Sequence, residues 1–391
     1  MKIKQKPHLH ASWIDPDALQ IVRTLQKAGF TTYLVGGCVR DLLTGIHPKD
    51  FDIATNAEPN QVKKKVHNSY IIGRRFRLVL VRRGSNQFEV ATFRRESTPE
   101  DFEGLAEDEK PSGDNFFGTP EQDAIRRDFT INALFYDSVK DELIDFVNGL
   151  ADIDARIIRM IGDPTQRILE DSIRSLRAIR LAHKLNFVIE DSLRQAMQEN
   201  GEALGKSILP RRREEYLKIL RLPNPSLVFV ELFDLGLLSY IFPTLHQIFQ
   251  DPRRLEIFSE ELELIHKIVE NPTLPSHMYT AFLAAFRKSA EGLNNLEELE
   301  DALMKNELGM FKNEISFVQG VFDFQKNLLE PDIFLRRGSR RQRAFIDNEF
   351  FPLALSLSIE DRSMTTSNSW FWREYLSYRE APTDSESDSE P

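Results

Sequence analysis

LVGGCVRDLLTGIHPKDFDIAT, residues 34–55, predicts a strand that ends at two glycines, a short helix, and a second strand that carries Asp50 and Asp52. Residues two apart on a strand point to the same face, so both carboxylates can hold one site. Divalent cations such as Mg²⁺ prefer carboxylate oxygens. Phosphates accept hydrogen bonds from backbone N–H groups where a glycine turn opens a helix. The stretch therefore predicts a magnesium–nucleotide site that includes Gly36 and Gly37.

The composition limits the class of protein. A chain of 391 residues is long enough for two or three packed units. No apolar run approaches the roughly 20 residues of a membrane helix, and the basic N-terminus lacks the apolar core of a signal peptide. Cys38 is the only cysteine, which excludes an intramolecular disulfide. Because it lies in the glycine turn, we interpret it as a packing residue. We expect a cytoplasmic protein without a membrane segment.

The charge is unevenly distributed. The net charge is −10, but residues 380–391 hold five acids and no base, which leaves −5 for the rest of the chain. Basic residues gather in short clusters: Arg74, Arg75, Arg77, Arg82 and Arg83; Arg94 and Arg95; Arg211, Arg212 and Arg213; and Arg336, Arg337, Arg340, Arg341 and Arg343. Local patches rather than net charge decide whether a phosphate backbone can bind. We therefore expect modest, salt-sensitive binding of RNA.

The pattern along the chain changes from mixed to helical. Residues 15–29 and 59–67 have helical signals, and 71–84 and 88–96 predict two strands joined by a turn at Gly84. Residues 97–121 are rich in Pro, Gly, Glu and Asp and predict a mobile surface loop that covers the site. From about residue 165 the periodicity is helical, and we expect no strand after about residue 190.

These motifs resemble a known family. GGCVRDLL and KDFDIAT, with five residues between them, resemble the first motif of the class II nucleotidyltransferases, which include bacterial poly(A) polymerases and CCA-adding tRNA nucleotidyltransferases. The resemblance continues in ATFRRE (91–96), RRDFTINALFYD (126–137) and EDSIRSLRAIRLAHKL (170–185). It implies an α/β nucleotidyltransferase head, a small mixed sheet with flanking helices, followed by an all-α neck and body. We place the catalytic head at 1–150, a nucleotide-selecting and RNA-binding neck at 151–222, a helical body at 223–379 and a disordered acidic tail at 380–391.

Carboxylates are the first candidates for chemistry. Nucleotidyl transfer is an in-line displacement at the α-phosphorus, in which two Mg²⁺ ions held by Asp50 and Asp52 would activate the 3′-hydroxyl and neutralise the leaving pyrophosphate. A third acid is either Asp128 or Glu89, and the resemblance favours Asp128. The competing interpretations are an N-cap or an ion pair with Arg126 or Arg127 for Asp128, and a cross-strand ion pair for Glu89.

The resemblance implies that arginines and one aspartate make the nucleotide contacts. Arg40, one turn into the short helix, would reach a phosphate or a ribose unless it pairs with Asp41. Four residues at intervals of three would form a stripe on one helix, which is otherwise typical of a salt-bridged face. The resemblance implies that they read the base and hold the triphosphate, and that the arginine of RRDFTINA contacts the nucleotide. The four residues of the stripe are Asp171, Arg174, Arg177 and Arg180, and the arginine of RRDFTINA is Arg127.

The two branches of the family differ outside the head motifs. IIGRRFRLVLV, 71–81, resembles the segment that separates bacterial poly(A) polymerases from CCA-adding enzymes. We therefore predict RNA polyadenylation: template-independent addition of AMP from ATP to RNA 3′ ends. Addition of CCA to tRNA, a non-catalytic RNA-binding protein on the same scaffold, and nucleotide transfer to a small molecule or protein are the alternatives. The RNA would bind at Arg74, Arg75, Arg77, Arg211, Arg212 and Arg213. The acidic end departs from the basic end that many such polymerases have.

Overall fold

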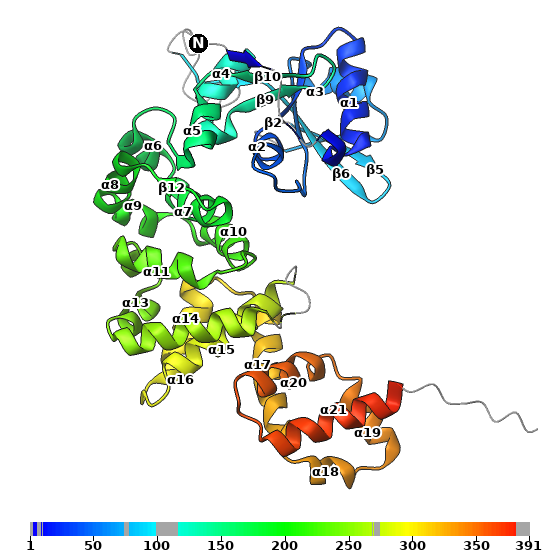
Figure 1. Ribbon diagram of the computed structural model, residues 1–391, viewed down its shortest axis with the longest axis vertical. Helices are drawn as coiled ribbons and strands as arrows, with labels where there is room; N and C mark the ends of the chain where they lie inside the picture. Colours follow the sequence, from blue (N-terminus) through cyan, green and yellow to red (C-terminus); the bar gives the residue numbers. More distant parts are fainter. Residues whose placement is uncertain are drawn as a thin grey trace, which may run out of the picture. The chain divides into compact units, whose positions relative to one another are not determined.

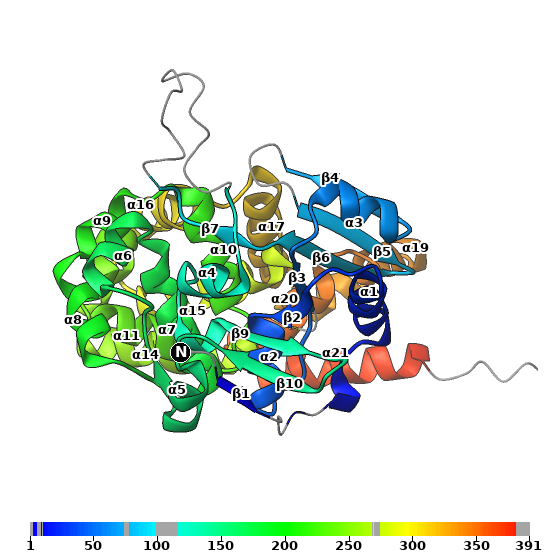
Figure 2. The ribbon, with the colours of Figure 1, turned by 90° about the horizontal axis from the view of Figure 1, so that it is seen from above.

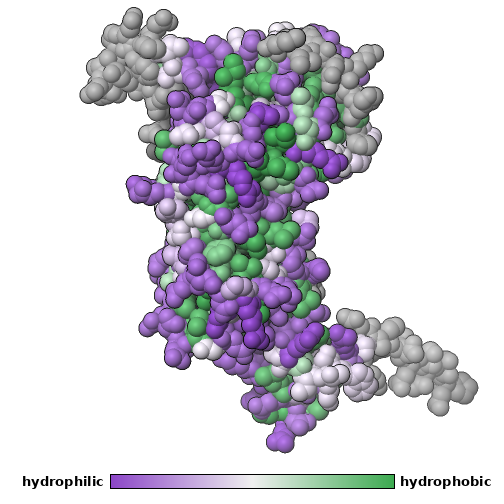
Figure 3. All heavy atoms as spheres, turned by 60° about the vertical axis from the view of Figure 1, so that its left-hand side comes forward, coloured by the Kyte–Doolittle hydropathy of each residue, from purple (hydrophilic) through white to green (hydrophobic). Residues whose placement is uncertain are grey.

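The computed structural model describes residues 3–5, 9, 11–73, 78–98, 116–267, 269 and 274–380. The chain forms two compact units, residues 1–200 and 201–391. The boundary between them falls within the segment 151–222 that we expected to form a neck. No described helix is both long and apolar enough to cross a membrane. Hydrophilic side chains cover most of the face shown in Figure 3.

The first unit is built on an eight-stranded mixed sheet (Figure 1). Its strand order is β1-β10-β9-β2-β3-β6-β5-β4, and every neighbouring pair is antiparallel except β3 and β6, which are parallel. The strands are β1 Ile3–Gln5, β2 Thr32–Val35, β3 Asp52–Thr55, β4 Ser69–Ile72, β5 Leu78–Arg83, β6 Asn86–Thr92, β9 Leu134–Asp137 and β10 Glu142–Asp145. The expected mixed sheet is confirmed.

Helices cover one face of this sheet. The expected helices form as α1 Pro16–Lys27 and α3 Pro59–Lys65, each with a proline in its first turn. Their apolar sides pack with alternate residues of the strands into one buried cluster, for example Val22 and Val62 with Ile53 and Val90. The short helix α2 Gly37–Leu43 follows β2, as the glycine turn predicts. Figures 1 and 2 show these elements around the sheet.

Two sequence predictions for the head were wrong in detail. Residues 71–84 do not form one strand, because β4 ends at Ile72 and β5 begins at Leu78. The expected loop 97–121 lies partly outside the described residues, but its end is ordered: β8 Phe116–Phe117 pairs with β7 Arg94–Arg95, and α4 Pro120–Ile125 follows. A Thr119 capping box starts α4.

The rest of the first unit is mostly helical. Its further elements are α5 Gly149–Ala155, β11 Ile157–Ile158, α6 Pro164–Glu170, α7 Ile173–Leu185, β12 Val188–Ile189 and α8 Asp191–Glu199. The short strands β11 and β12 pair in parallel and connect the end of α5 to the end of α7. The apolar side of α7 is buried, including Leu176 and Ile179. The opposite side of α7 therefore remains for polar residues.

The second unit contains only helices in the part of the chain that the structure describes, as expected. They are α9 Gly201–Lys206, α10 Leu209–Ile219, α11 Ser226–Asp234, α12 Leu238–Ile241, α13 Pro243–Phe249, α14 Pro252–His266, α15 Pro275–Ser289, α16 Leu296–Ala302, α17 Lys312–Leu328, α18 Pro331–Leu335, α19 Ser339–Ile346, α20 Phe351–Glu360 and α21 Thr366–Glu380. Aromatic clusters hold it together, one around Phe229 and Phe282 and another around Phe345 and Trp372. Of the expected acidic tail, Glu380 ends α21 and the remainder lies outside the described residues.

Candidate active site

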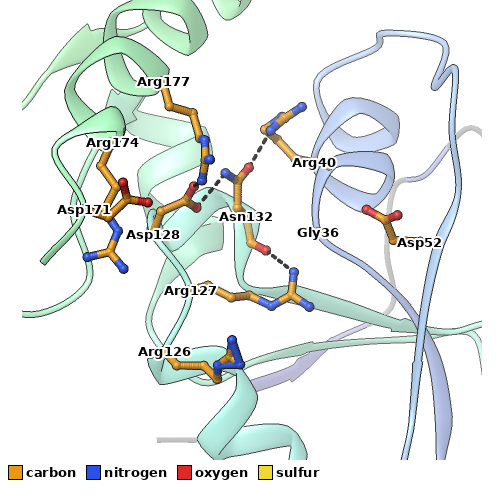
Figure 4. A pocket seen from close by; sticks show the side chains of 11 residues that line it. Gly36, Arg40, Asp52, Arg126, Arg127, Asp128, Asn132, Asp171, Arg174 and Arg177 are labelled. Carbon is orange, nitrogen blue, oxygen red and sulfur yellow. Dashed lines mark hydrogen bonds and ion pairs between the residues drawn. The ribbon is translucent and has the colours of Figure 1, made fainter. Parts of the chain in front are cut away.

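A pocket of about 380 Å³ lies in the first unit (Figure 4). It is lined by Gly36, Gly37, Arg40, Asp52, Arg126, Arg127, Asp128, Asn132, Asp171, Arg174 and Arg177. These residues come from the start of α2, the start of β3, the segment that follows α4, and the junction of α6 with α7. The pocket thus brings together most of the predicted residues, although Asp50 and Arg180 are not among those that line it.

Gly36 is the glycine that the pocket requires. It has a φ of 75°, in the left-handed region that favours glycine. A Cβ atom at this position would lie 2.8 Å from Nη1 of Arg127 and 3.9 Å from Oδ2 of Asp52. A Cβ atom at Gly37 would meet only Nη2 of Arg40, at an ordinary 3.5 Å. A side chain at Gly36 would therefore displace Arg127, whereas Gly37 has more room.

The carboxylates beside the pocket differ from the prediction in one respect. β3 begins at Asp52, so Asp50 lies two residues before the strand rather than on it, and its side chain is exposed. Asp52 pairs in register with Glu89 of the parallel strand β6. The side chain of Asp52 also reaches the surface, but desolvation of its carboxylate and the charges of Glu89 and Asp50 raise its pKa, and Arg127 partly opposes this shift. Negative charge is thus concentrated at the start of β3.

These oxygens fit a magnesium ion. No three His, Cys, Asp or Glu side chains within the described residues stand together as a metal-binding group. However, Mg²⁺ in nucleotide sites commonly takes one or two carboxylates and completes its shell with water and phosphate oxygens. Asp52 with either Asp50 or Glu89 supplies such a pair. A divalent cation would also offset the repulsion from Glu89 and Asp50, which adds to desolvation in raising the pKa of Asp52.

Asp128 lies in the pocket but is engaged by protein donors. Its Oδ2 accepts a hydrogen bond from Nη1 of Arg177 at 2.7 Å, and its Oδ1 accepts from the Asn132 amide at 3.0 Å and the Phe129 N–H at 2.8 Å. Burial raises the pKa of Asp128, but Arg177 and these hydrogen bonds outweigh it, so the pKa lies below its usual value. Asp128 therefore forms an ion pair, but with Arg177 rather than with Arg126 or Arg127 as the sequence suggested, and Arg127 pairs with Asp123 instead. This geometry favours Glu89 over Asp128 as the companion of Asp52.

A matched pair of substitutions can separate these two acids. We expect Glu89→Gln to raise the Mg²⁺ concentration for half-maximal nucleotide transfer about tenfold or more, because a carboxylate next to Asp52 is lost. Asp128→Asn should leave the Mg²⁺ requirement near that of the wild type and raise the KM for the nucleotide instead. Magnesium titrations of both variants check this expectation. The reverse pattern would restore Asp128 as the third acid.

Arg40 is held in place from two sides. Its side chain is buried, and its Nε and Nη2 atoms donate to Oδ1 of Asp41 at 2.9 and 2.6 Å. Nζ of Lys184 on α7 donates to the other oxygen of Asp41 at 2.7 Å. Nη1 of Arg40 donates to the side-chain oxygen of Asn132. The pairing with Asp41 is therefore realised, and Arg40 still lines the pocket.

Asn132 connects the arginines of the site. Its side-chain oxygen accepts from Arg40, its amide nitrogen donates to Asp128, and its backbone oxygen accepts from Nη1 of Arg127 at 3.1 Å. Because Asp128 in turn holds Arg177, one amide fixes groups from α2, α7 and the segment after α4. Asn132 was not among the predicted site residues, although it lies inside the RRDFTINA motif.

Asp123 holds the side chain of Arg127, and Arg167 holds the backbone of both Arg126 and Arg127. Nε and Nη2 of Arg127 donate to Oδ2 of Asp123 at 3.1 and 3.0 Å. Nη2 of Arg167, on α6, donates to the backbone oxygens of Arg126 and Arg127 at 2.7 and 2.8 Å. Arg167 was not predicted as a site residue. Its ion pair with Glu170, three residues on, follows from helical spacing, but its contacts with Arg126 and Arg127 join residues about 40 apart in the sequence.

The junction of α6 and α7 corrects the predicted arginine stripe. Residues 170–180 do not form one helix, because Glu170 ends α6, Asp171 caps it with a φ of −149°, and α7 begins at Ile173. The break places Asp171 and Arg174 on the side of the pocket opposite Asp52 (Figure 4). Nη1 of Arg174 donates to the Arg167 carbonyl at 2.6 Å and to Glu170 at 3.0 Å. Asp171 and Arg174 thus form a fixed edge of the pocket.

The remaining predicted residues lie elsewhere. Arg74, Arg75 and Arg77 fall outside the described residues. Arg211, Arg212 and Arg213 belong to α10 of the second unit, where Arg211 is exposed but Arg213 pairs with Glu314 and packs over the Phe311 ring. Cys38 is buried, its thiol contacts the Val35 carbonyl, and burial followed by the nearby Asp52 charge raises its pKa to about 12. The packing interpretation of Cys38 is confirmed.

Comparison with known proteins identifies the family. Residues 32–159 match the model of the poly A polymerase head domain, and residues 186–249 match a model described as "Probable RNA and SrmB- binding site of polymerase A". The chain is 34% identical over 390 residues to poly(A) polymerase I of Haemophilus influenzae, covering 92% of this chain and 84% of that protein. The chain belongs to the class II nucleotidyltransferases.

This nucleotidyltransferase is similar to members of both branches of the family, the poly(A) polymerases and the CCA-adding enzymes. It is 33% identical over 277 residues to the CCA-adding enzyme of Lactobacillus helveticus, covering 71% of this chain and 65% of that protein. It shares the fold of the Bacillus stearothermophilus CCA-adding enzyme solved in complex with CTP, with a TM-score of 0.63, 24% identity, and coverage of 94% and 82% of the two chains. The chain spans 52% of the length of poly(A) polymerase I of Salmonella typhi, which it also matches.

Proposed function

We propose that the protein is a template-independent polymerase that adds AMP from ATP to RNA 3′ ends. The single observation that carries this proposal is the pocket in which Asp52, beside Glu89, faces a set of fixed arginines and Asp171. Acidic oxygens suit a metal ion, and arginines suit a triphosphate. The similarity to poly(A) polymerase I over nearly the whole chain supports the choice of ATP and RNA.

Each side of the pocket has a separate task in this proposal. Arg40 and Arg127 contact phosphates next to Gly36, where the absent side chain lets the backbone come close. Asp171 and Arg174 offer an acceptor and donors to the edge of the base, so that the protein selects a nucleotide without a template strand. Arg177 and Arg180 add positive charge along α7, and Asp128 holds Arg177 in position.

Magnesium would bind at Asp50, Asp52 and Glu89. Bound there, it supplies the positive charge that lowers the pKa of the attacking 3′-hydroxyl and neutralises the leaving pyrophosphate. The protein's own contribution is to hold the triphosphate with its arginines at a fixed distance from the carboxylate of Asp52, which would hold the cation. Preorganised arginines stabilise the charge that develops on the phosphates during transfer.

The RNA would bind through basic residues beyond the pocket. Arg74, Arg75 and Arg77 in the head, and Arg211 and Arg212 on α10, remain our candidates. We leave Arg213 out of this surface, because its charge is used in the pair with Glu314. We further propose that the reaction takes place in the cytoplasm, where a chain with one buried cysteine needs no disulfide.

Addition of CCA to tRNA is the second candidate function. The similarity to the Lactobacillus helveticus enzyme favours it, and both branches would use the same carboxylates and arginines. A non-catalytic RNA-binding protein is disfavoured by the complete set of residues in the pocket. These possibilities predict different products from the same substrates.

A primer-extension assay with Mg²⁺ tests the proposal. The acceptors are an unstructured RNA and a tRNA that lacks its 3′ CCA, each with ATP alone, CTP alone or both. We expect long A tails on both RNAs from ATP alone. Two C residues and one A on the tRNA alone would make the protein a CCA-adding enzyme, and the absence of any product would contradict both proposals.

A further inference from the structure

One row of side chains crosses the sheet from Asp52 to its edge. Asp52 on β3 lies opposite Glu89 on β6, Glu89 lies opposite Leu80 on β5, and Leu80 lies opposite Tyr70 on the edge strand β4. Directly opposed residues point to the same face of a sheet. With strands about 4.8 Å apart, Tyr70 lies about 14 Å from Asp52 along this row. The row therefore leads away from the carboxylates on the face to which Asp52 points.

Along β4 and β5 this face is exposed and partly apolar, whereas nearer β2 it carries a buried cluster that includes Ala54 and Phe93. The neighbours Val79, Val81 and Val90 point to the other face, into the buried cluster beneath α1 and α3. On the open face Tyr70 is 52% exposed and Ile72 39% exposed. The guanidinium of Arg82 lies over the Tyr70 ring, 5.5 Å from its centroid. We name the five residues of this surface the shelf: Tyr70, Ile72, Leu78, Leu80 and Arg82.

The geometry of the reaction decides what should lie on the shelf. In an in-line displacement, the attacking and leaving oxygens stand on opposite sides of the α-phosphorus. The arginines that hold the triphosphate come from α2, α7 and the segment after α4, on one side of Asp52. The attacking 3′-hydroxyl must then approach from the other side, where β6, β5 and β4 follow in the sheet. The shelf lies on that path.

The chemistry of the shelf matches single-stranded RNA. Aromatic rings stack with bases whatever their sequence, and an adjacent arginine contributes a cation for the phosphate backbone. Tyr70 and Arg82 supply this combination, and Leu78 and Leu80 extend the apolar surface towards Glu89. We propose that the shelf binds the single-stranded 3′ end of the acceptor RNA, with a base stacked on Tyr70, and that this subsite guides the 3′-hydroxyl to Asp52. The proposal rests on the proposed function.

Substitutions of Tyr70 in the full chain test the subsite. We expect Tyr70→Ala and Tyr70→Leu to raise both the KM for RNA and the Kd for a fluorescein-labelled oligoadenylate about 5- to 150-fold. Tyr70→Phe keeps an aromatic ring and should stay near the wild-type values. The KM for ATP should not change in any of them, because the nucleotide pocket contains none of the shelf residues. Arg82→Gln should reduce the slope of log affinity against log salt by about 0.7.

The outcomes separate this subsite from the proposed function. If the wild type adds AMP but Tyr70→Ala binds and extends RNA as well as Tyr70→Phe does, the subsite is refuted and the function stands. If the wild type extends no RNA, the proposed function fails, and oligoadenylate binding still decides the shelf: weaker binding by Tyr70→Ala but not by Tyr70→Phe supports it, and equal binding refutes it. Thermal unfolding midpoints of the variants within a few degrees of the wild type exclude misfolding as the cause.

Discussion

Asp52→Asn should lower the rate of nucleotide transfer about 10³-fold or more while leaving the fold intact. Asp52 stands at the start of β3, where the metal and the α-phosphate would meet. An amide keeps the shape of the side chain but loses the charge that holds a cation. Burial and the charges of Glu89 and Asp50 already disfavour the ionised form of Asp52. Removing that charge should therefore keep or raise the free energy of unfolding without metal.

Magnesium provides the second measurement for this variant. A ligand that binds only the folded state raises the free energy of unfolding by about 2.7 kcal/mol at a hundredfold excess over its Kd. We expect added Mg²⁺ to raise the unfolding midpoint of the wild type and to have almost no effect on Asp52→Asn. Asp154→Asn, which changes an exposed aspartate on α5, is the matched control and should behave like the wild type. A transfer rate above a tenth of the wild-type rate in Asp52→Asn would contradict the proposed role of Asp52.

The sequence predicted the head well where the signals were local. The glycine turn before α2, the helix that begins at Pro59 and the turn between β5 and β6 each depend on residues that are neighbours along the chain. Gly36, Arg40, Asp52 and Arg127 could be chosen for the same reason, because each lies in a short motif. Local motifs thus identified most of the residues that line the pocket.

The contacts that organise the pocket could not be predicted in this way. Arg40 and Asn132 are 92 residues apart, and Lys184 and Asp41 are 143 apart. Nothing in the sequence alone says that these side chains meet, because the sheet and α7 bring them together only after folding. The role of Asn132 as the connection between Arg40, Asp128 and Arg127 is therefore a finding of the structure.

Two errors came from periodicity that continues across a break. The interval of three that joins Arg174, Arg177 and Arg180 also reaches back to Asp171, although α7 begins only at Ile173 and Asp171 caps α6. Spacing alone cannot show that Asp171 has a φ of −149° rather than a helical value. Likewise, polar and apolar residues alternate in KDFDIAT from Asp50 onwards, but the strand and its pairing with β6 begin only at Asp52. The prediction therefore placed Asp50 on the strand, whereas Asp50 precedes it.

Arg177→Met should lower the free energy of unfolding by about 3 kcal/mol at neutral pH. Its partner Asp128 has a side chain only 12% exposed, so the substitution leaves a nearly buried carboxylate without its cation. The hydrogen bonds from Asn132 and the Phe129 N–H remain, which keeps the loss at the lower end of the range for broken buried pairs. Arg23→Met on the exposed side of α1 should change stability by less than about 0.5 kcal/mol.

The pH dependence of that loss identifies the charge responsible. The pKa of Asp128 is lowered in the folded protein, so its ionisation stabilises the fold above the pKa of an unfolded aspartate and this stabilisation disappears as the pH falls through the lowered value. In Arg177→Met the pKa of Asp128 should rise, because burial then dominates. Asp128 would become protonated on mild acidification, and the difference in stability from the wild type should shrink. Urea unfolding at neutral and mildly acidic pH measures this difference.

A double substitution separates the unpaired charge from the lost packing. Asp128→Asn combined with Arg177→Met leaves no buried charge, so it should be more stable than Arg177→Met alone. The double variant should nevertheless transfer nucleotides poorly, because the arginine that faces the pocket is gone. If instead Arg177→Met and the double variant unfold at the same urea concentration at every pH, Asp128 is not the origin of the loss. The loss of stability would then come from the missing Arg177 side chain itself and not from the unpaired Asp128 carboxylate.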